Sequence, residues 1–305
     1  MKLLAAFLRL IRWPNLVFII ITQVIFYTCV YMPLFGQPQN RKFIILVIAS
    51  LFIAAAGYII NDYFDINIDR VNKPAKNVVD RVIHRRSAII WHFVLSLLGV
   101  VLTGWAVGLA SWYIVLANFA SVFLLWFYST SFKRKYIIGN VVISLLTSWT
   151  ILVLFFAFTQ PSDAYRSGDP VSVKFFRMAF LYAGFAFILS LIREAIKDME
   201  DLEGDVKYNC RTLPVVSGIR ATKLYVSVWI IVLMASLGVL QLYVLQFGWW
   251  ILTIYSVVLI ILPLFLLLKK TNKATTPADF HYLSNICKGI MLAGILSMIF
   301  FRFYF

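Results

Sequence analysis

The sequence predicts an all-α membrane protein with nine transmembrane helices and a cytoplasmic N-terminus. Hydrophobic residues make up 62% of the 305 residues and charged residues only 13%, against the roughly 25% that is usual in a soluble domain. Apolar stretches of about 20 residues, each long enough to cross a bilayer, recur along nearly the whole chain. The lysines and arginines are also distributed unevenly between alternate loops.

Polar segments, most of them short, separate the apolar stretches. The longer ones lie at about 62–87, 159–174 and 194–221, and none is rich enough in charge to form a soluble domain. The first apolar stretch is too long for a signal-peptide core and lacks a small-residue cleavage site, so we expect it to be retained. We predict one polytopic domain over residues 1–305. Its predicted spans are 15–35, 43–61, 88–109, 112–129, 137–158, 175–193, 222–245, 248–268 and 283–303.

Membrane topology explains most of the net charge of +15. Nine spans place alternate loops on opposite sides of the membrane. The N-terminus and the loops after even-numbered spans, with their flanks, hold 21 of the 28 lysines and arginines; the other side holds six, and Lys288 lies within the last span. This asymmetry places the N-terminus in the cytoplasm. It predicts a multi-pass protein of the cell (inner) membrane rather than a protein that binds nucleic acid.

The pattern Asp-x-x-Asp-x-x-x-Asp occurs twice, each time directly after a long apolar stretch. Two carboxylates about 4 Å apart repel each other by about 4 kcal/mol at an effective dielectric constant of 20. Acidic side chains at the end of a membrane span are therefore candidates for a functional site. Their oxygen atoms suit Mg²⁺, which commonly holds phosphate groups. The two copies contain six of the 13 acidic residues, namely Asp62, Asp65, Asp69, Asp198, Asp201 and Asp205.

Both copies follow even-numbered spans, so they lie on the side predicted to face the cytoplasm. One isolated Asp-x-x-Asp is explained more simply as a solvated helix end, but two copies with identical spacing favour a metal site. They are offset by 136 residues and four spans, which preserves their orientation. We therefore expect two pseudo-repeated halves, about 1–135 and 136–305, that each contribute one acidic cluster to a shared cavity.

A helix that continues through each motif would bring its acidic residues onto one face. In the first motif, Asn61 and the three aspartates would share roughly a quarter of the helix circumference. In the second, Glu194 and the three aspartates would fall within about 60° of one another. Gly204 is expected to break the second helix before Asp205.

Basic side chains accompany both motifs on the same side. Arginine suits bidentate contacts with phosphate oxygens, and lysine neutralises them as a point charge. We therefore predict that an anionic substrate such as a diphosphate is bound by Lys73, Lys76, Lys133, Arg134, Arg193 and Lys197.

Four segments carry recognisable motifs. They are 61–69 with Asn72-Lys73-Pro74, 193–205 with Thr212-Leu213-Pro214, 12–15 (Arg-Trp-Pro-Asn), and 128–134 with Gly139-Asn140. In this combination they resemble the UbiA-type intramembrane prenyltransferases, for which two aspartate motifs of this form are highly specific. The similarity extends from about residue 10 to residue 303.

This resemblance implies nine transmembrane helices around a central cavity, capped by the two motifs on the cytoplasmic side. It also implies Mg²⁺ as the cofactor and transfer of an isoprenoid group from its diphosphate to a lipid-like acceptor, at an active site that faces the cytoplasm. Asp65, Asp69, Asp198 and Asp201 are the predicted catalytic residues, and Asn15 is expected to contact the diphosphate or the substrate. The implied metal ligands are Asn61, Asp62, Asp65, Asp69, Asp198, Asp201 and Asp205.

The residues within these motifs also indicate which acceptor receives the prenyl group. The Arg193-Glu194-x-x-Lys197-Asp198 sequence and the Gly139-Asn140 pair most resemble the branch of the family that alkylates geranylgeranylglyceryl phosphate. This favours geranylgeranyl diphosphate as the donor and an ether-lipid acceptor. Prenylation of an aromatic quinone precursor, of the 4-hydroxybenzoate or dihydroxynaphthoate type, is the alternative within the family.

A divalent-cation transporter is the alternative from another class, with the carboxylates as its ion site. Both clusters lie at one face of the membrane, whereas secondary transporters bind their substrates near the midplane, so the enzyme is favoured. A cation-dependent phosphoalcohol transferase is also disfavoured, because the Asp-Gly-x-x-Ala-Arg pattern of that family does not occur in the chain.

Cysteine labelling tests the predicted topology. In a background without the three native cysteines, new cysteines near Lys76 and Lys207 should react only with reagents that reach the cytoplasm, because both positions follow even-numbered spans. A cysteine near Ser167, which follows the fifth span, should be labelled from outside. Labelling of the Lys76 and Lys207 positions from opposite sides would contradict a shared cavity.

Overall fold

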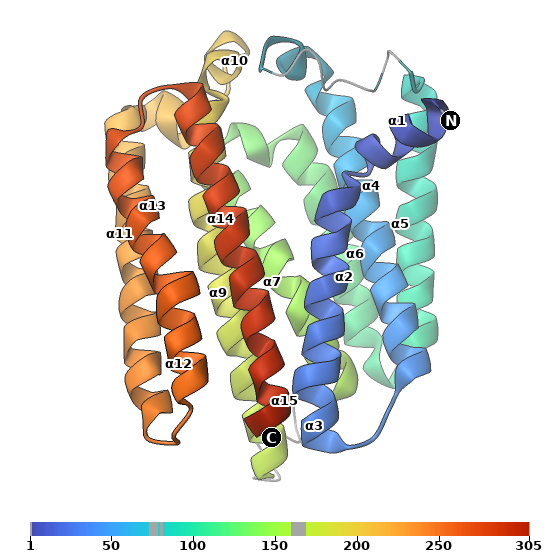
Figure 1. The fold of residues 1–305 in the computed structure, drawn as a ribbon. Coiled ribbons are helices and arrows are strands. Elements are labelled where there is room, and N and C mark those ends of the chain that lie inside the picture. The colour runs from blue at the N-terminus through green and yellow to red at the C-terminus, as the bar shows by residue number, and fades with distance from the viewer. Residues whose placement is uncertain (1, 73–78, 80–81, 160–168, 305) are drawn as a thin grey trace.

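The protein is a bundle of long helices. Its computed structural model describes residues 2–72, 79, 82–159 and 169–304. Within these residues, nine helical segments are long and apolar enough to cross a membrane, which confirms the predicted fold class (Figure 1). They are Trp13–Phe35, Asn40–Ile68, Arg85–Val107, Trp112–Thr130, Ile138–Phe158, Pro170–Glu200, Leu213–Leu245, Trp250–Lys273 and Pro277–Tyr304.

Some spans are built from consecutive helical pieces. Short π-helical segments, η1 and η4, interrupt the first and the eighth span. In chain order the elements are α1 (Lys2–Leu10), α2 (Trp13–Phe26), η1 (Tyr27–Tyr31), α3 (Met32–Phe35), α4 (Asn40–Asn72), α5 (Arg85–Val107), η2 (Leu109–Ser111), α6 (Trp112–Thr130), η3 (Phe132–Arg134), α7 (Ile138–Phe158), α9 (Pro170–Glu200), α10 (Leu202–Lys207), α11 (Leu213–Leu245), α12 (Trp250–Ser256), η4 (Val257–Ile261), α13 (Leu262–Lys273), α14 (Pro277–Ser297), η5 (Met298–Phe300) and α15 (Phe301–Tyr304).

Polar caps define the start of two spans. The Asp169 carboxylate accepts hydrogen bonds from the backbone N–H groups of Val171 and Ser172, at 3.3 and 2.9 Å, where α9 begins. Thr276 and Asp279 form a capping box at the start of α14. Each cap satisfies backbone donors that have no partner within the first helical turn.

The two aspartate motifs lie at the same end of the bundle, near α1 and α10 (Figure 1). α4 continues through the first motif to Asn72, as expected. The second motif differs from expectation, because the helix breaks at Asp201 rather than at Gly204. The Asp201 N–H completes α9 with a bond to the Lys197 carbonyl at 2.9 Å, and the Asp201 carbonyl starts α10 by accepting from the Asp205 N–H at 3.2 Å. The single acidic face predicted along one helix is therefore divided between two.

An aromatic cluster closes the opposite end of the bundle. Phe175 of α9 lies at its centre, with ring-centroid distances of 5.4 Å to Phe26 and 5.5 Å to Phe155. These three rings are almost completely buried and belong to one apolar core cluster. Because aromatic pairs at such distances pack favourably, this end of the bundle is tightly packed and apolar, in contrast to the motif end.

Gly139 allows α7 to pack tightly against η3. A Cβ atom at this position would lie 2.8 Å from Lys133 Cα and 2.9 Å from the Phe132 carbonyl oxygen. Both neighbours are backbone atoms, so no rotation of a side chain would relieve the clash. The absence of a side chain at Gly139 thus determines where the Lys133 side chain leaves the backbone.

Replacing Gly139 by alanine should therefore destabilise the protein. We expect Gly139→Ala to lower the free energy of unfolding by about 1–3 kcal/mol, the usual cost of overpacking. Thermal unfolding of the detergent-solubilised protein measures the change. The matched control is Gly184→Ala in α9, where a Cβ would meet nothing within 4 Å and helix propensity favours alanine. Equal stability of the two variants would contradict the tight packing of α7 against η3.

Candidate active site

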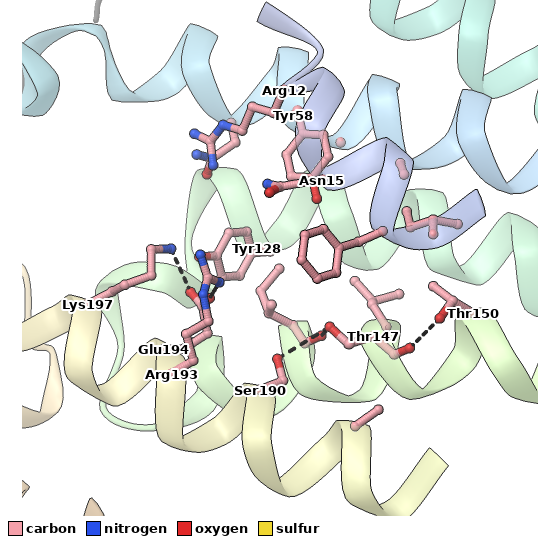
Figure 2. A pocket seen from close by; sticks show the side chains of 18 of the residues that line it. Arg12, Asn15, Tyr58, Tyr128, Thr147, Thr150, Ser190, Arg193, Glu194 and Lys197 are labelled. Atoms are coloured by element: carbon pink, nitrogen blue, oxygen red, sulfur yellow. Dashed lines mark hydrogen bonds and ion pairs between the residues drawn. The ribbon is translucent and has the colours of Figure 1, made fainter. Parts of the chain in front are cut away.

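A cavity of about 840 Å³ lies between α2, α4, α6, α7, α9 and α14. Residues of both aspartate motifs line one end of it. Ile151, Tyr182 and Met298 line the other end and also belong to the apolar core cluster there. Figure 2 shows polar side chains from α2 and α4 facing those of α9 across this space. A mainly apolar cavity with charged groups gathered toward one end is typical of a small-molecule site.

Opposite charges are balanced in the cavity wall. Seven basic and seven acidic side chains of the described residues line it, so a cation and an anion together preserve the balance better than either alone. The basic residues are Arg9, Arg12, Lys133, Arg134, Arg193, Lys197 and Lys288, and the acidic residues are Asp62, Asp65, Glu194, Asp198, Glu200, Asp201 and Asp205.

Basic side chains from other segments hold the first motif. Arg12, between α1 and α2, donates from Nη2 to Asp62 Oδ1 at 2.6 Å, and its guanidinium lies 5.3 Å from the centre of the Tyr58 ring. Lys133 of η3 donates to Asp65, and its Nζ also lies 3.4 Å from Asn61 Oδ1. The Asp65 side chain therefore depends on the η3 segment that Gly139 positions.

Neutral hydrogen-bond donors hold the second motif. Asn140 of α7 donates from Nδ2 to Asp198 Oδ2 at 2.8 Å. Thr212, just before α11, donates from Oγ1 to Asp205 Oδ2 at 2.9 Å. Since neither partner is charged, these contacts orient the carboxylates without neutralising them.

Glu194 lies one turn before Asp198 on α9 and forms a compact ion cluster. Arg193 Nη1 donates to its Oε1 at 2.8 Å, and Lys197 Nζ donates to its Oε2 at 3.0 Å. The Nε of Arg193 is buried without a hydrogen-bond partner. Figure 2 shows these three residues together on α9, across the cavity from Arg12.

Cys210 lies within electrostatic range of both motifs. Burial raises the pKa of its thiol to about 11, and the negative charges of Asp205 and, to a smaller extent, Asp65 add to this effect. The following residue, Arg211, donates its backbone N–H to the Arg134 carbonyl at 2.8 Å. The two acidic clusters therefore converge near a neutral thiol.

The structure brings most of the predicted site residues to one cavity. The Asp69 side chain, Lys73 and Lys76 lie outside the described residues. The predicted site residues that line the cavity are Asn15, Asn61, Asp62, Asp65, Lys133, Arg134, Arg193, Lys197, Asp198, Asp201 and Asp205.

Several residues that line this cavity or contact the motifs were not predicted from the sequence. Arg12 and Asn140 lie within the motifs quoted above, but their partners are distant in sequence. Lys288 carried a detectable signal, because a lone basic residue within a span is a functional candidate. Tyr128 and Thr212 also lie within the quoted segments, but nothing in the sequence distinguished them from their neighbours there.

The oxygen atoms of the two motifs fit a divalent cation. Carboxylate and amide oxygens are the ligands that Mg²⁺ prefers, and here they line the cavity from α4 on one side and from α9 and α10 on the other. Within the described part of the chain, no three acidic, histidine or cysteine side chains are already grouped as a metal site. The carboxylates of Asp62 and Asp65 are instead ion-paired with Arg12 and Lys133.

Comparison with known sequences agrees with this arrangement. A curated protein of Methanocaldococcus jannaschii, named digeranylgeranylglyceryl phosphate synthase, is 29% identical over 98% of both chains. A protein of that name from Natronomonas pharaonis is 31% identical over 74% of this chain and 72% of its own. The alignment with the Methanosphaera stadtmanae protein of that name, at 28% identity, covers 64% of this chain and 65% of the relative.

Comparison with solved structures supports the same fold. A structure of digeranylgeranylglyceryl phosphate synthase matches with a TM-score of 0.63 and 28% identity, over 98% of this chain and 99% of that one. A UbiA homologue from Archaeoglobus fulgidus, solved with GPP and Mg²⁺, matches with a TM-score of 0.60 and 17% identity over 96% and 99%. The sequence profile of the UbiA prenyltransferase family matches residues 16–286. The chain therefore belongs to the UbiA prenyltransferase family, a family of membrane-embedded transferases.

Proposed function

We propose that this prenyltransferase transfers a geranylgeranyl group from its diphosphate to the free hydroxyl of geranylgeranylglyceryl phosphate. The observation that carries the proposal is the convergence of two aspartate motifs and their basic neighbours at one end of an apolar cavity. Relatives named digeranylgeranylglyceryl phosphate synthase support the choice of acceptor, because one of them aligns over 98% of both chains.

We propose Mg²⁺ as the cofactor. A UbiA homologue has been solved with Mg²⁺ and an isoprenoid diphosphate, and the oxygen donors of both motifs suit the same ion. Bound there, Mg²⁺ would neutralise the charge that develops on the departing diphosphate. The residues that would hold it are Asn61, Asp62, Asp65, Asp69, Asp198, Asp201 and Asp205, and of these Asp65, Asp69, Asp198 and Asp201 are proposed as catalytic.

Basic side chains at the motif end would grip the diphosphate. Lys133 now holds Asp65, and Arg193 has a buried donor without a partner, so each has hydrogen-bonding capacity for a phosphate oxygen. Electrostatic stabilisation of a leaving group by fixed charges is commonly the largest contribution to catalysis. The proposed contacts are Asn15, Lys73, Lys76, Lys133, Arg134, Arg193 and Lys197.

The depth of the cavity suits a 20-carbon tail. From Asp198 to Tyr182, α9 rises about 24 Å, and from His281 to Met298, α14 and the first residue of η5 rise about 25 Å, at about 1.5 Å per residue. All four residues line the cavity. A geranylgeranyl chain has about 15 carbon–carbon bonds of about 1.5 Å along its backbone and therefore spans about 19 Å when extended. The hydroxyl of Tyr182 forms a 2.8 Å hydrogen bond with that of Ser297.

Charge favours a phosphorylated acceptor. A glycerol phosphate brings a second anion into the cavity, and Arg9, Arg12 and Lys288 line the wall in addition to the cations proposed for the diphosphate. A phenolic acid carries less charge and reacts at a ring carbon, so it would not need these three additional cations. We place the site on the cytoplasmic side, in a single domain of two pseudo-repeated halves.

The proposal is tested with purified protein in lipid vesicles, Mg²⁺ and matched panels of substrates. Geranylgeranylglyceryl phosphate should be prenylated, and its dephosphorylated analogue should react poorly, with products identified by mass spectrometry. Among donors with 10, 15 and 20 carbons, the longest should give the highest kcat/KM, because it fills the depth of the cavity. Preference for 4-hydroxybenzoate or a dihydroxynaphthoate would refute the ether-lipid acceptor and leave only the family assignment.

Both acidic clusters should be necessary for transfer. Asp65→Ala or Asp201→Ala should reduce prenyl transfer about 100-fold or more, because each removes an oxygen ligand from the end of the cavity where charge develops. EDTA should abolish wild-type activity and Mg²⁺ should restore it. The matched control is Asp169→Asn, at the other end of α9, which should remain active. Full activity of the Asp65→Ala/Asp201→Ala double variant would refute the metal–diphosphate site.

A further inference from the structure

Glu194 is a buried carboxylate in the cavity wall that belongs to neither aspartate motif. It lies four positions before Asp198 on α9, so the two residues share one helix face and are separated by about 6 Å along the axis. Relative to the motifs, Glu194 is nearer to the apolar part of the cavity. This position, outside both motifs, favours a role other than metal binding.

Two cations keep this carboxylate ionised. Arg193 Nη1 and Lys197 Nζ each donate to a different carboxylate oxygen, at 2.8 and 3.0 Å. An isolated carboxylate would be strongly disfavoured in such a buried place, but two charged donors offset much of that cost. The cluster thus keeps the Glu194 carboxylate negatively charged, and able to accept a proton, next to the apolar part of the cavity.

Ether formation has to dispose of one proton. When the acceptor hydroxyl bonds to the first carbon of the prenyl group, its oxygen carries a positive charge until the proton leaves. A protonated ether is a far stronger acid than a carboxylic acid, so an ionised carboxylate accepts the proton readily even while ion-paired. If the diphosphate is held at the motifs, the reacting carbon lies on their apolar side, at the level of Glu194.

We propose that Glu194 accepts the proton of the acceptor hydroxyl during ether formation, an inference that rests on the proposed function. The bond between the first prenyl carbon and the diphosphate oxygen breaks, and its electron pair leaves with the diphosphate. A lone pair of the hydroxyl oxygen forms the new carbon–oxygen bond, and the O–H proton moves to a carboxylate oxygen of Glu194. Water at the open end of the cavity then removes this proton, so the products are the ether, diphosphate and one proton.

The other acidic residues described in the cavity wall are less suited to this role. The aspartates of both motifs are proposed metal ligands. Glu200 lies six positions beyond Glu194, toward the motif end, and its carboxylate contacts His281 Nδ1 at 3.0 Å. Among them, Glu194 alone combines a place below the motifs with ion pairs to two basic side chains.

The test measures ether and diphosphate separately, by mass spectrometry and by an enzymatic assay for inorganic diphosphate. The wild type should release one diphosphate for each ether. Glu194→Gln preserves the size of the side chain but removes the proton acceptor, so ether formation should fall about 100-fold or more. Diphosphate release should fall much less, because water captures the prenyl group and yields the prenyl alcohol. Glu194→Asp keeps the carboxylate and should retain ether formation with one-to-one stoichiometry.

The matched control is Glu203→Gln, an exposed position of α10 outside the cavity wall, which should form both products at wild-type rates. Ether formation by Glu194→Gln close to the wild-type rate would overturn the inference. So would equal losses of both products, or equal losses in the Gln and Asp variants, since these would indicate a role in donor binding or folding. Failure of the wild type to make any ether would instead refute the proposed function.

Discussion

Negative charge concentrated at the end of an apolar cavity is the constraint on which the rest of this structure depends. Buried carboxylates that repel one another and lose hydration are costly, by several kcal/mol for each charge left uncompensated. For Asp62, Asp65 and Asp198 the described partner comes from a segment at least 50 residues away in the sequence, so satisfying these carboxylates also holds the ends of separate helices together. The partners are Arg12 for Asp62, Lys133 for Asp65, Asn140 for Asp198 and Thr212 for Asp205.

Local conformations that would otherwise be unfavourable follow from this constraint. Arg12 adopts a left-handed backbone conformation with φ of 50°, which costs roughly 1–2 kcal/mol for a residue with a side chain. The turn it makes between α1 and α2 aims its guanidinium at Asp62. Gly139 permits the contact between α7 and η3 that brings Lys133 to Asp65. The strained backbone of Arg12 and the tight contact at Gly139 therefore both lie beside ion pairs of the first motif.

Charge in the cavity is arranged at two levels along α9. Asp198 and Asp201 lie at the motif end, where neighbouring oxygen donors suit a cation and a diphosphate. Glu194 lies about one turn deeper, between Arg193 and Lys197. Below it the wall combines apolar side chains with uncharged polar ones such as Thr147 and Ser190. In the proposed mechanism, this separation assigns the leaving group and the acceptor hydroxyl to different residues of one helix.

The sequence by itself determined the nine spans and placed both aspartate motifs at one end of them, because hydropathy and helical spacing are local properties of the chain. It predicted a helix break at Gly204, whereas α9 ends with Asp201 as its C-cap and α10 begins at Leu202. Nor did it predict which cation compensates which carboxylate, since Arg12 and Asp62 are 50 residues apart and Lys133 and Asp65 are 68 apart. Such pairings arise only when the helices pack, because they depend on the distance between side chains in space.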